Sequence, residues 1–288
     1  MSNNFRMIWD NSKFDAATLT ASSEAANLPV TNLQDTKRRK VWRTTGITGQ
    51  YFTADLGDNP KTVHCVAFVN HNFTTTATVT ITASNASDFS DPVYSASDVR
   101  LWQNVYPWGA GSWGEGSWGG GLSEEDRNAL FISPIRIIWT GAVKARYWKF
   151  EFADDSNTDG YFEIGRVFIS PYFEPKYNFA HGWEIGIKED TVITKSVGKQ
   201  KWVDEKPWYH VIKLPLHAIA ETDKYSGFIA MCKRLGVRKD FILDLFPNAT
   251  ETSKELYNTF YGSFTENPVI TGRYNRYSQS QLVFEESL

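Results

Sequence analysis

The chain has 288 residues, of which 41% are hydrophobic and 22% charged, and its formal net charge at pH 7 is −3. This length allows one to three domains with sizeable cores, and the charge balance excludes the overall electrostatic footprint of a nucleic-acid-binding protein. No run approaches the ~18 apolar residues that a membrane-spanning helix needs. We therefore expect no nucleic-acid specificity and no membrane span, and the first thirty residues, about the length of a signal peptide, lack the apolar core of one.

Alternating and β-branched segments dominate the first half of the chain. The chain as a whole is rich in aromatic residues, with 11 Trp, 13 Tyr and 19 Phe. Such residues fit pleated, half-buried surfaces. Their spacing of roughly ten residues predicts a β-sandwich. The predicted strands are Val41–Thr44, Tyr51–Gly57, Thr62–Asn70, Thr74–Ala83, Ile132–Trp139 and two within Arg146–Ser170.

The one basic run of the chain lies between Lys37 and Lys40, and its ordinary interpretation is a solvated loop. Cys65 and Cys232 lie far apart, each among apolar residues. This placement predicts buried free thiols rather than a disulfide framework. Free thiols suit assembly in a reducing cytoplasm.

The segment 106–121 departs from the strand pattern. Trp108, Trp113 and Trp118 recur every five residues, and each is followed by Gly. The glycines predict a surface loop, in which a row of exposed tryptophans would be costly. Two interpretations stay open: the rings pack on their own sandwich or on a neighbouring subunit, or they stack on the faces of a sugar ligand.

Arg146–Ser170 contains two alternating runs around one polar turn, which predicts a half-buried β-hairpin that closes the sandwich. Asp155, Asn157 and Asp159 in this turn match the start of a calcium-binding loop. The position of its bidentate Glu is taken by Arg166, and no helix flanks the turn. The alternative is a turn whose Asp and Asn side chains bond their own backbone, so we expect no metal and keep these three residues as the weak calcium candidate.

The pattern breaks at Ser170–Pro175, and we place a domain boundary near Tyr172. Six segments of the second half are predicted to be strands, and one stretch is predicted to be helical. The predicted strands are Trp183–Lys188, Thr191–Val197, Trp208–Leu216, Phe241–Phe246, Leu256–Gly262 and Ser280–Glu285, whereas Lys199–Asp204 is polar.

Glu221–Leu235 is the predicted helix. Tyr225, Phe228, Ile229, Cys232 and Leu235 would share one face of it. A threonine in the first turn can cap its start, and the glycine that follows the last turn is placed to terminate it.

No catalytic motif is present. The five histidines, His64, His71, His181, His210 and His217, show no zinc spacing, and neither a nucleophile elbow nor a phosphate-binding loop occurs. The acidic pairs near residues 124–126 and 154–155 lie in loops, where carboxylates are usually solvated. We predict a non-enzymatic protein without cofactors and with no catalytic residues.

Residues 1–172 resemble galactose-binding-like, discoidin-type β-sandwich modules. The resemblance rests on the order of four segments and implies a jelly-roll-like binding or interaction domain. The 106–121 insertion departs from this pattern, so the usual ligand loops of the family are not carried over. The segments are Val41–Thr44, Tyr51–Gly57, Val63–Val69 and Arg146–Ile169 with its two strands.

Residues 173–288 resemble the tube-type domain of siphophage distal tail proteins, through paired strands, one amphipathic helix and the closing strand Gln281–Glu286. The resemblance implies a mainly β protein with a tail-tube-like β-sandwich or barrel after the first sandwich. It also implies a structural tail-tip or baseplate component of the virion tail, made in the host cytoplasm, that forms a ring (hexamer or trimer) linking tube to tip proteins. Parts of Trp183–Val197 and of Gln281–Glu286 are then expected near subunit contacts.

The alternative function is a carbohydrate-binding adhesion module that contacts host surface glycans. A glycan hydrolase would be a third class, and it would require two carboxyl groups facing each other across a cleft. The assembly interpretation is our main expectation from the sequence.

Overall fold

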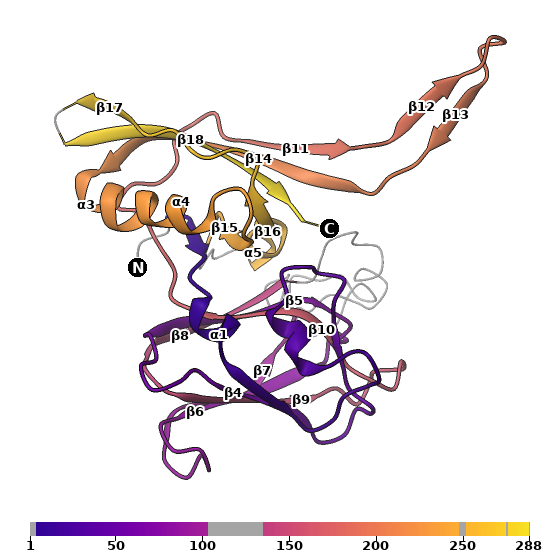
Figure 1. Cartoon of the computed structure of the whole chain (residues 1–288), viewed down its shortest axis with the longest axis vertical. Helices are drawn as coiled ribbons and strands as arrows, with labels where there is room; N and C mark the ends of the chain where they lie inside the picture. Colours follow the sequence, from indigo (N-terminus) through magenta and orange to yellow (C-terminus); the bar gives the residue numbers. More distant parts are fainter. Residues whose placement is uncertain (1–3, 103–134, 248–251, 275, 288) are drawn as a thin grey trace, which may run out of the picture. The chain divides into compact units, whose positions relative to one another are not determined.

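The computed structural model describes residues 4–102, 135–247, 252–274 and 276–287. Contacts between Cα atoms divide the chain into two compact units (Figure 1). Unit 1 takes Arg6–Phe173 together with Asp244–Thr259, and unit 2 takes Glu174–Leu243 and Phe260–Leu288. Unit 2 also takes Asn4 and Phe5. The division thus differs from a simple split at Tyr172 by two segments, Asp244–Thr259 in unit 1 and the N-terminal residues in unit 2.

Unit 1 is built on two antiparallel sheets. The first has the order β2-β4-β9-β6-β7. Its strands are Thr18–Ala21 (β2), Gln50–Asp55 (β4), Tyr147–Ala153 (β9), Thr78–Ser84 (β6) and Pro92–Arg100 (β7). The second has the order β3-β10-β5-β8. Its strands are Trp42–Arg43 (β3), Glu163–Ser170 (β10), Val63–His71 (β5) and Ile135–Val143 (β8).

The two sheets share one core. Phe52 and Phe150 stack with ring centroids 4.7 Å apart, and Phe68 from the opposite sheet meets Phe150 edge-on at 5.8 Å. Trp42 and Trp148 are fully buried in the same cluster. Each buried aromatic of this kind contributes about 1.5–3 kcal/mol or more by removal from water, so this aromatic layer holds the sandwich together.

The predicted hairpin is wrong. β9 pairs with β4 and β6 in one sheet, whereas β10 pairs with β3 and β5 in the other. Alternation reports which face of a strand is buried, and both strands bury a face in the same core, so the pattern does not reveal their partners. The turn between them crosses from sheet to sheet, and buried Asp154 holds its start by accepting hydrogen bonds from Thr74 N at 2.8 Å and Thr74 Oγ1 at 2.5 Å.

Shorter elements complete unit 1. They are β1 (Arg6–Ile8), α1 (Ser12–Asp15), the 3-10 turn η1 (Val30–Gln34) and α5 (Thr252–Tyr257). Met7 and Phe173 form an antiparallel bridge. β7 is a strand of nine residues, and its pairing with β6 has two register shifts.

Unit 2 has a sheet in which β15, β16, β18, β14 and β11 follow one another, with β17 paired to β18. The strands are Phe241–Asp244 (β15), Thr259–Phe264 (β16), Tyr277–Glu286 (β18), Trp208–Ala220 (β14), Glu184–Glu189 (β11) and Thr271–Tyr274 (β17). A separate two-stranded hairpin consists of Val192–Lys195 (β12) and Lys201–Asp204 (β13). β13 lies in a segment predicted to be polar without a strand.

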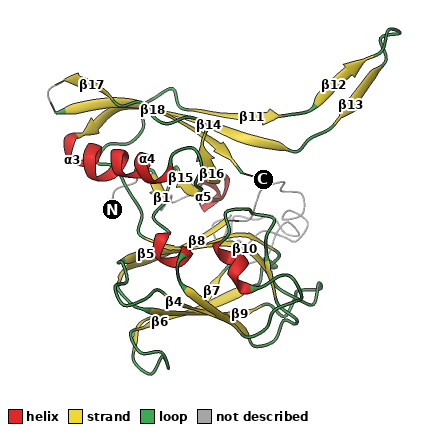
Figure 2. Ribbon diagram, in the orientation of Figure 1, coloured by secondary structure: helices red, strands yellow, loops and turns green. Residues whose placement is uncertain are grey.

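The predicted helix is present, but its buried face differs. It consists of α3 (Glu221–Asp223), the π-helical turn η2 (Lys224–Ile229) and α4 (Ala230–Leu235), which lie along one face of the β14–β18 sheet (Figure 2). A π turn closes i→i+5 hydrogen bonds and shifts the helix faces. Phe228, Met231 and Leu235 are therefore buried, whereas Tyr225 is exposed.

Of the two predictions for the ends of this helix, the one for its C-terminal end is confirmed and the one for its N-terminal end is wrong. Gly236, at φ +55°, terminates it, as predicted, and donates its N–H to Cys232 O. Thr222 lies inside the first turn and caps nothing, because the N-cap is Ala220 and makes no side-chain cap bond. The fold class is confirmed: the protein is mainly β with a β-sandwich and one principal helix.

Candidate functional site

The three candidate ligand residues, Trp108, Trp113 and Trp118, lie outside the described residues, as does the acidic pair near 124–126. Their role in binding or packing stays a prediction.

The calcium-candidate turn is occupied by internal hydrogen bonds. Asn157 Oδ1 accepts from Asp159 N at 2.9 Å, and Asp159 Oδ2 accepts from Asn72 Nδ2 at 2.9 Å. Asp155 is exposed at the surface of the turn. Within the described ranges, no three His, Cys, Asp or Glu side chains gather in a way that could hold a metal ion.

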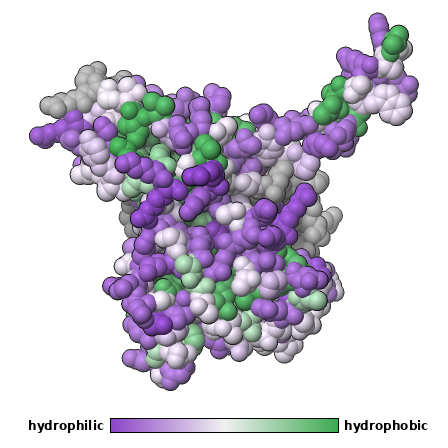
Figure 3. Space-filling view, in the orientation of Figure 1, coloured by the Kyte–Doolittle hydropathy of each residue, from purple (hydrophilic) through white to green (hydrophobic). Residues whose placement is uncertain are grey.

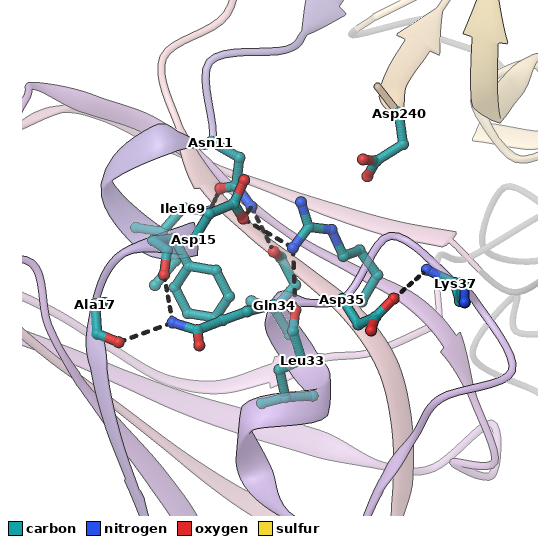
Figure 4. Close-up of polar contacts among 12 residues, drawn as sticks. Asn11, Asp15, Ala17, Leu33, Gln34, Asp35, Lys37, Ile169 and Asp240 are labelled. Carbon is teal, nitrogen blue, oxygen red and sulfur yellow. Dashed lines mark hydrogen bonds and ion pairs between the residues drawn. The ribbon is translucent and has the colours of Figure 1, made fainter. Parts of the chain in front are cut away.

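Arg166, which takes the place of the calcium-binding Glu, has a structural role instead. Its guanidinium is 1% exposed, lies 2.8 Å from Asp15 Oδ1 and donates to Leu33 O at 3.4 Å. Asn11 extends the network (Figure 4), because it donates to Asp15 at 3.0 Å and accepts from Ile169 N at 3.0 Å. The network connects α1 and η1 to β10.

The basic run lies in a loop, as predicted, and the predicted burial of the cysteines holds for Cys65 alone. Lys40 Nζ lies 2.7 Å from Asp35, and this hydrogen bond lowers the pKa of that carboxyl. Cys65 is buried and Cys232 half-buried, and neither forms a disulfide. Burial raises the pKa of both thiols.

One carboxyl group lies in a strongly perturbed environment. Asp244 is fully buried, and its burial, followed by the nearby Glu255, raises its pKa well above the usual range. Perturbed acids are functional candidates when a substrate can reach them. Asp244 is closed to solvent, so it does not offer a catalytic acid at the surface of unit 1.

A polar cluster around an aromatic ring lies on the surface of unit 1. The Arg43 guanidinium sits 4.2 Å above the ring of Tyr161, and Arg43 Nε donates to Glu163 at 2.5 Å. Asn72 joins this cluster by donating to Tyr161 O at 3.0 Å, beside its bond to Asp159. Converging amide, carboxylate and guanidinium groups beside an aromatic ring are the kind of groups that orient a small polar ligand.

Unit 2 carries an exposed projection. Residues 189–206, which we call the arm, extend from the ends of β11 and β14 beyond the rest of the unit (Figure 1). Every residue of β12 and β13 is exposed. Ile193 is 57% exposed, Val203 51% and Trp202 65%. Hydrophobic and hydrophilic residues lie side by side on the arm (Figure 3).

The arm adjoins an open sheet edge. β11 is the last strand beside β14, and within the described part of the chain no strand pairs with its outer edge. Ile185 and Ile187 on β11 are both exposed. Edge strands with apolar side chains are ready to pair with another chain, and this edge falls within the predicted contact segment Trp183–Val197.

The other predicted contact segment is not an edge. Gln281–Glu286 belongs to β18, which lies between β14 and β16. His210 N and Nδ1 also contact Glu286 Oε2, at 3.1 and 2.6 Å. β14 pairs with one side of this segment, and β16 pairs with Phe284–Glu286 on the other side. Its expected position near a subunit contact stays a prediction.

No helix in the described residues is long and apolar enough to cross a membrane. No protein-family model matches the chain, and no curated protein does.

Comparison with solved structures finds similarity to carbohydrate-binding domains, three of which follow. The lectin domain of lectinolysin complexed with Lewis B antigen is 13% identical, with a TM-score of 0.37 over 60% of this chain and 100% of that one. A Streptococcus pneumoniae fucose binding module is 13% identical, with a TM-score of 0.36 over 55% and 93%. The family 32 CBM from C. perfringens NanJ in complex with galactose is 15% identical, with a TM-score of 0.37 over 58% and 99%. At these values the ligands named belong to those proteins and identify none for this chain.

Proposed function

We propose that the chain is a non-catalytic assembly protein whose unit 2 attaches to other protein chains through the arm. The observation that carries the proposal is the row of exposed apolar side chains on β12 and β13. An isolated two-stranded hairpin is at best marginally stable in water. Contact with a partner would bury a face of this hairpin, and each large apolar side chain that becomes buried contributes about 1.5–3 kcal/mol.

The specific form of this proposal is a component of a phage tail tip or baseplate, in the virion tail. Copies of unit 2 would form a ring of six or three that links tube to tip proteins. The order of elements in the second half of the chain supports it, since paired strands precede one helix and a hydrophobic strand. A ring requires contacts between different patches on neighbouring copies.

Mass measurement and electron microscopy of the full chain test the assembly. Wild type should form particles of more than one copy as its concentration rises. The double variant Ile193→Ser/Val203→Ser should remain monomeric, and Val93→Ser, which changes an equally exposed valine of unit 1, should assemble like wild type. Wild type that stays monomeric at every concentration, or an arm variant that assembles normally, would refute the proposal.

A second candidate function is carbohydrate binding by unit 1. Two observations favour it: the repeated Trp-Gly pairs of 106–121 and the cluster of Arg43, Tyr161 and Glu163. Large rigid aromatics and charged hydrogen-bonding groups are the usual contents of a small-molecule site. The ligand class would be a host surface glycan.

A glycan array tests this candidate. Binding that is reproducible in wild type should be lost in Trp113→Ala or Arg43→Ala. Arg146→Ala is the matched control, because Arg146 also lies over a tyrosine ring, at 4.9 Å, elsewhere in unit 1. An array on which wild type binds no glycan would exclude the candidate, as would equal loss in the control.

A further inference from the structure

The charges of the arm are ordered along its length. Acidic side chains predominate where the arm begins, the apolar pair Ile193 and Val203 lies in its middle, and lysines lie at its tip around the exposed Val197. The one lysine at the base, Lys206, is paired with Asp204 at 2.8 Å. We call the first group the base acids, which are Glu189, Asp190 and Glu205. We call the last group the tip lysines, which are Lys195, Lys199 and Lys201. Among the described residues, no ion pair joins any of these six side chains to another residue.

The register of the hairpin places its central apolar pair and its lysine pair on one face. Ile193 is opposite Val203, and Lys195 is opposite Lys201. Opposite residues share a face of an antiparallel pair, and so do residues two positions apart. The face that carries the apolar pair therefore carries the lysine pair towards the tip, and the same period places Glu205 on it towards the base.

The lysine pair is unfavourable in the isolated chain. Like charges directly opposite each other destabilise an antiparallel pair. Lys199 adds a third positive charge to the tip, in the left-handed conformation at φ +63°. A partner that brings negative charge to the tip would remove this cost.

We propose that this face binds the same face of a second copy, with the two arms packed face to face and antiparallel. A two-fold axis through the middle of the arms sets the lysine pair of each copy against the acidic base of the other. The same axis brings Ile193 and Val203 of both copies together. The acidic, apolar and basic order is thus complementary to itself, which is the property of an isologous contact. An unrelated acidic partner would neutralise the tip lysines but would leave the base acids without an opposite charge.

The contact is small, because each arm presents a short ladder of side chains. Interfaces of this size lie below about 1,200 Å² and are weak, so we expect a reversible dimer. Charge pairs that are open to solvent are screened by salt, and the dimer should therefore weaken as the ionic strength rises. This inference rests on the proposed attachment through the arm and specifies its partner as a second copy. Because the contact is isologous, it is an alternative to the ring form of that proposal.

Charge reversal tests the pairing in the full chain. One variant replaces all three tip lysines by Glu, and another replaces all three base acids by Lys. Native mass spectrometry should show each variant alone as a monomer, since its tip and base then carry the same sign. An equimolar mixture should form a heterodimer, because each tip again faces an opposite charge. The control variant reverses three exposed cations away from the arm, Lys233, Arg238 and Lys239, and should dimerise like wild type.

Each outcome decides between the inference and the proposed function. Assembly that is lost in Ile193→Ser/Val203→Ser but unchanged by both charge reversals would overturn the antiparallel pairing and leave the assembly function standing. A mixture that forms particles larger than a dimer would also overturn the two-fold contact, in favour of a ring. Wild type that never associates would overturn both.

Discussion

Asp15 is the residue at which the buried network of unit 1 is best tested. Its carboxylate lies 2.8 Å from Arg166, whose guanidinium is 1% exposed, whereas the Asp15 side chain is 38% exposed. Removing one partner of a buried ion pair leaves the other charge uncompensated and costs about 3–5 kcal/mol. Because Asp15 is partly solvated, we expect Asp15→Ala to lower the free energy of unfolding by about 3 kcal/mol, the lower end of that range.

This loss is large for a protein whose total stability is of the order of 5–15 kcal/mol. At roughly 2–4 °C per kcal/mol for a domain of this size, the Tm of unit 1 should fall by about 6–12 °C. Differential scanning calorimetry measures it, and hydrogen exchange of β10 peptides assigns the transition to unit 1. The control is Asp35→Ala, since Asp35 pairs with Lys40 at the surface and exposed pairs contribute about 0–1 kcal/mol.

An Asp15→Ala variant with the same Tm as Asp35→Ala would refute the reasoning. It would mean that the Arg166 guanidinium finds enough compensation from carbonyl groups such as Leu33 O without a carboxylate. The double variant Asp15→Leu/Arg166→Met should recover most of the loss, because removing both charges leaves none buried.

Three further predictions concern a glycine in unit 2, a surface ion pair and the calcium-candidate turn. Gly262→Ala should unfold or greatly destabilise unit 2 in calorimetry, because a Cβ would lie 2.0 Å from Glu285 O, whereas Gly186→Ala, with its nearest atom at 3.8 Å, should remain folded. Asp55→Asn should lower stability by at most about 1 kcal/mol at neutral pH. The hydrogen bond from Arg146 lowers the pKa of Asp55 in the folded state. The stabilisation by this pair is therefore complete above the unfolded-state pKa and is lost as the pH falls through the folded-state pKa. In urea titrations, the difference in unfolding free energy between wild type and Asp55→Asn should disappear below about pH 4. Adding Ca²⁺ should leave the Tm unchanged, because side chains of the 155–160 turn are already hydrogen-bonded to each other and to the chain; a rise that saturates with Ca²⁺ would show that the turn binds the ion.

The sequence by itself determined the class of the fold and most of its elements. Period-two alternation in segments such as Tyr51–Gly57 shows which side chains are buried, because one face of a strand packs on the core. The apolar spacing of Glu221–Leu235 and the glycine after it likewise predicted the helix and its end. These signals are local, since each depends on neighbouring residues in the chain.

Only the tertiary structure decided the pairing partners and the exposed surfaces. β9 and β10 alternate alike but lie in opposite sheets, because burial of a face does not specify the strand alongside. Arg166 looked like a departure from a calcium loop, and its partner Asp15 lies far away in sequence. Val192 and Ile193 would suit a core, and their exposure on the arm depends on whether another element covers them, which no local pattern records.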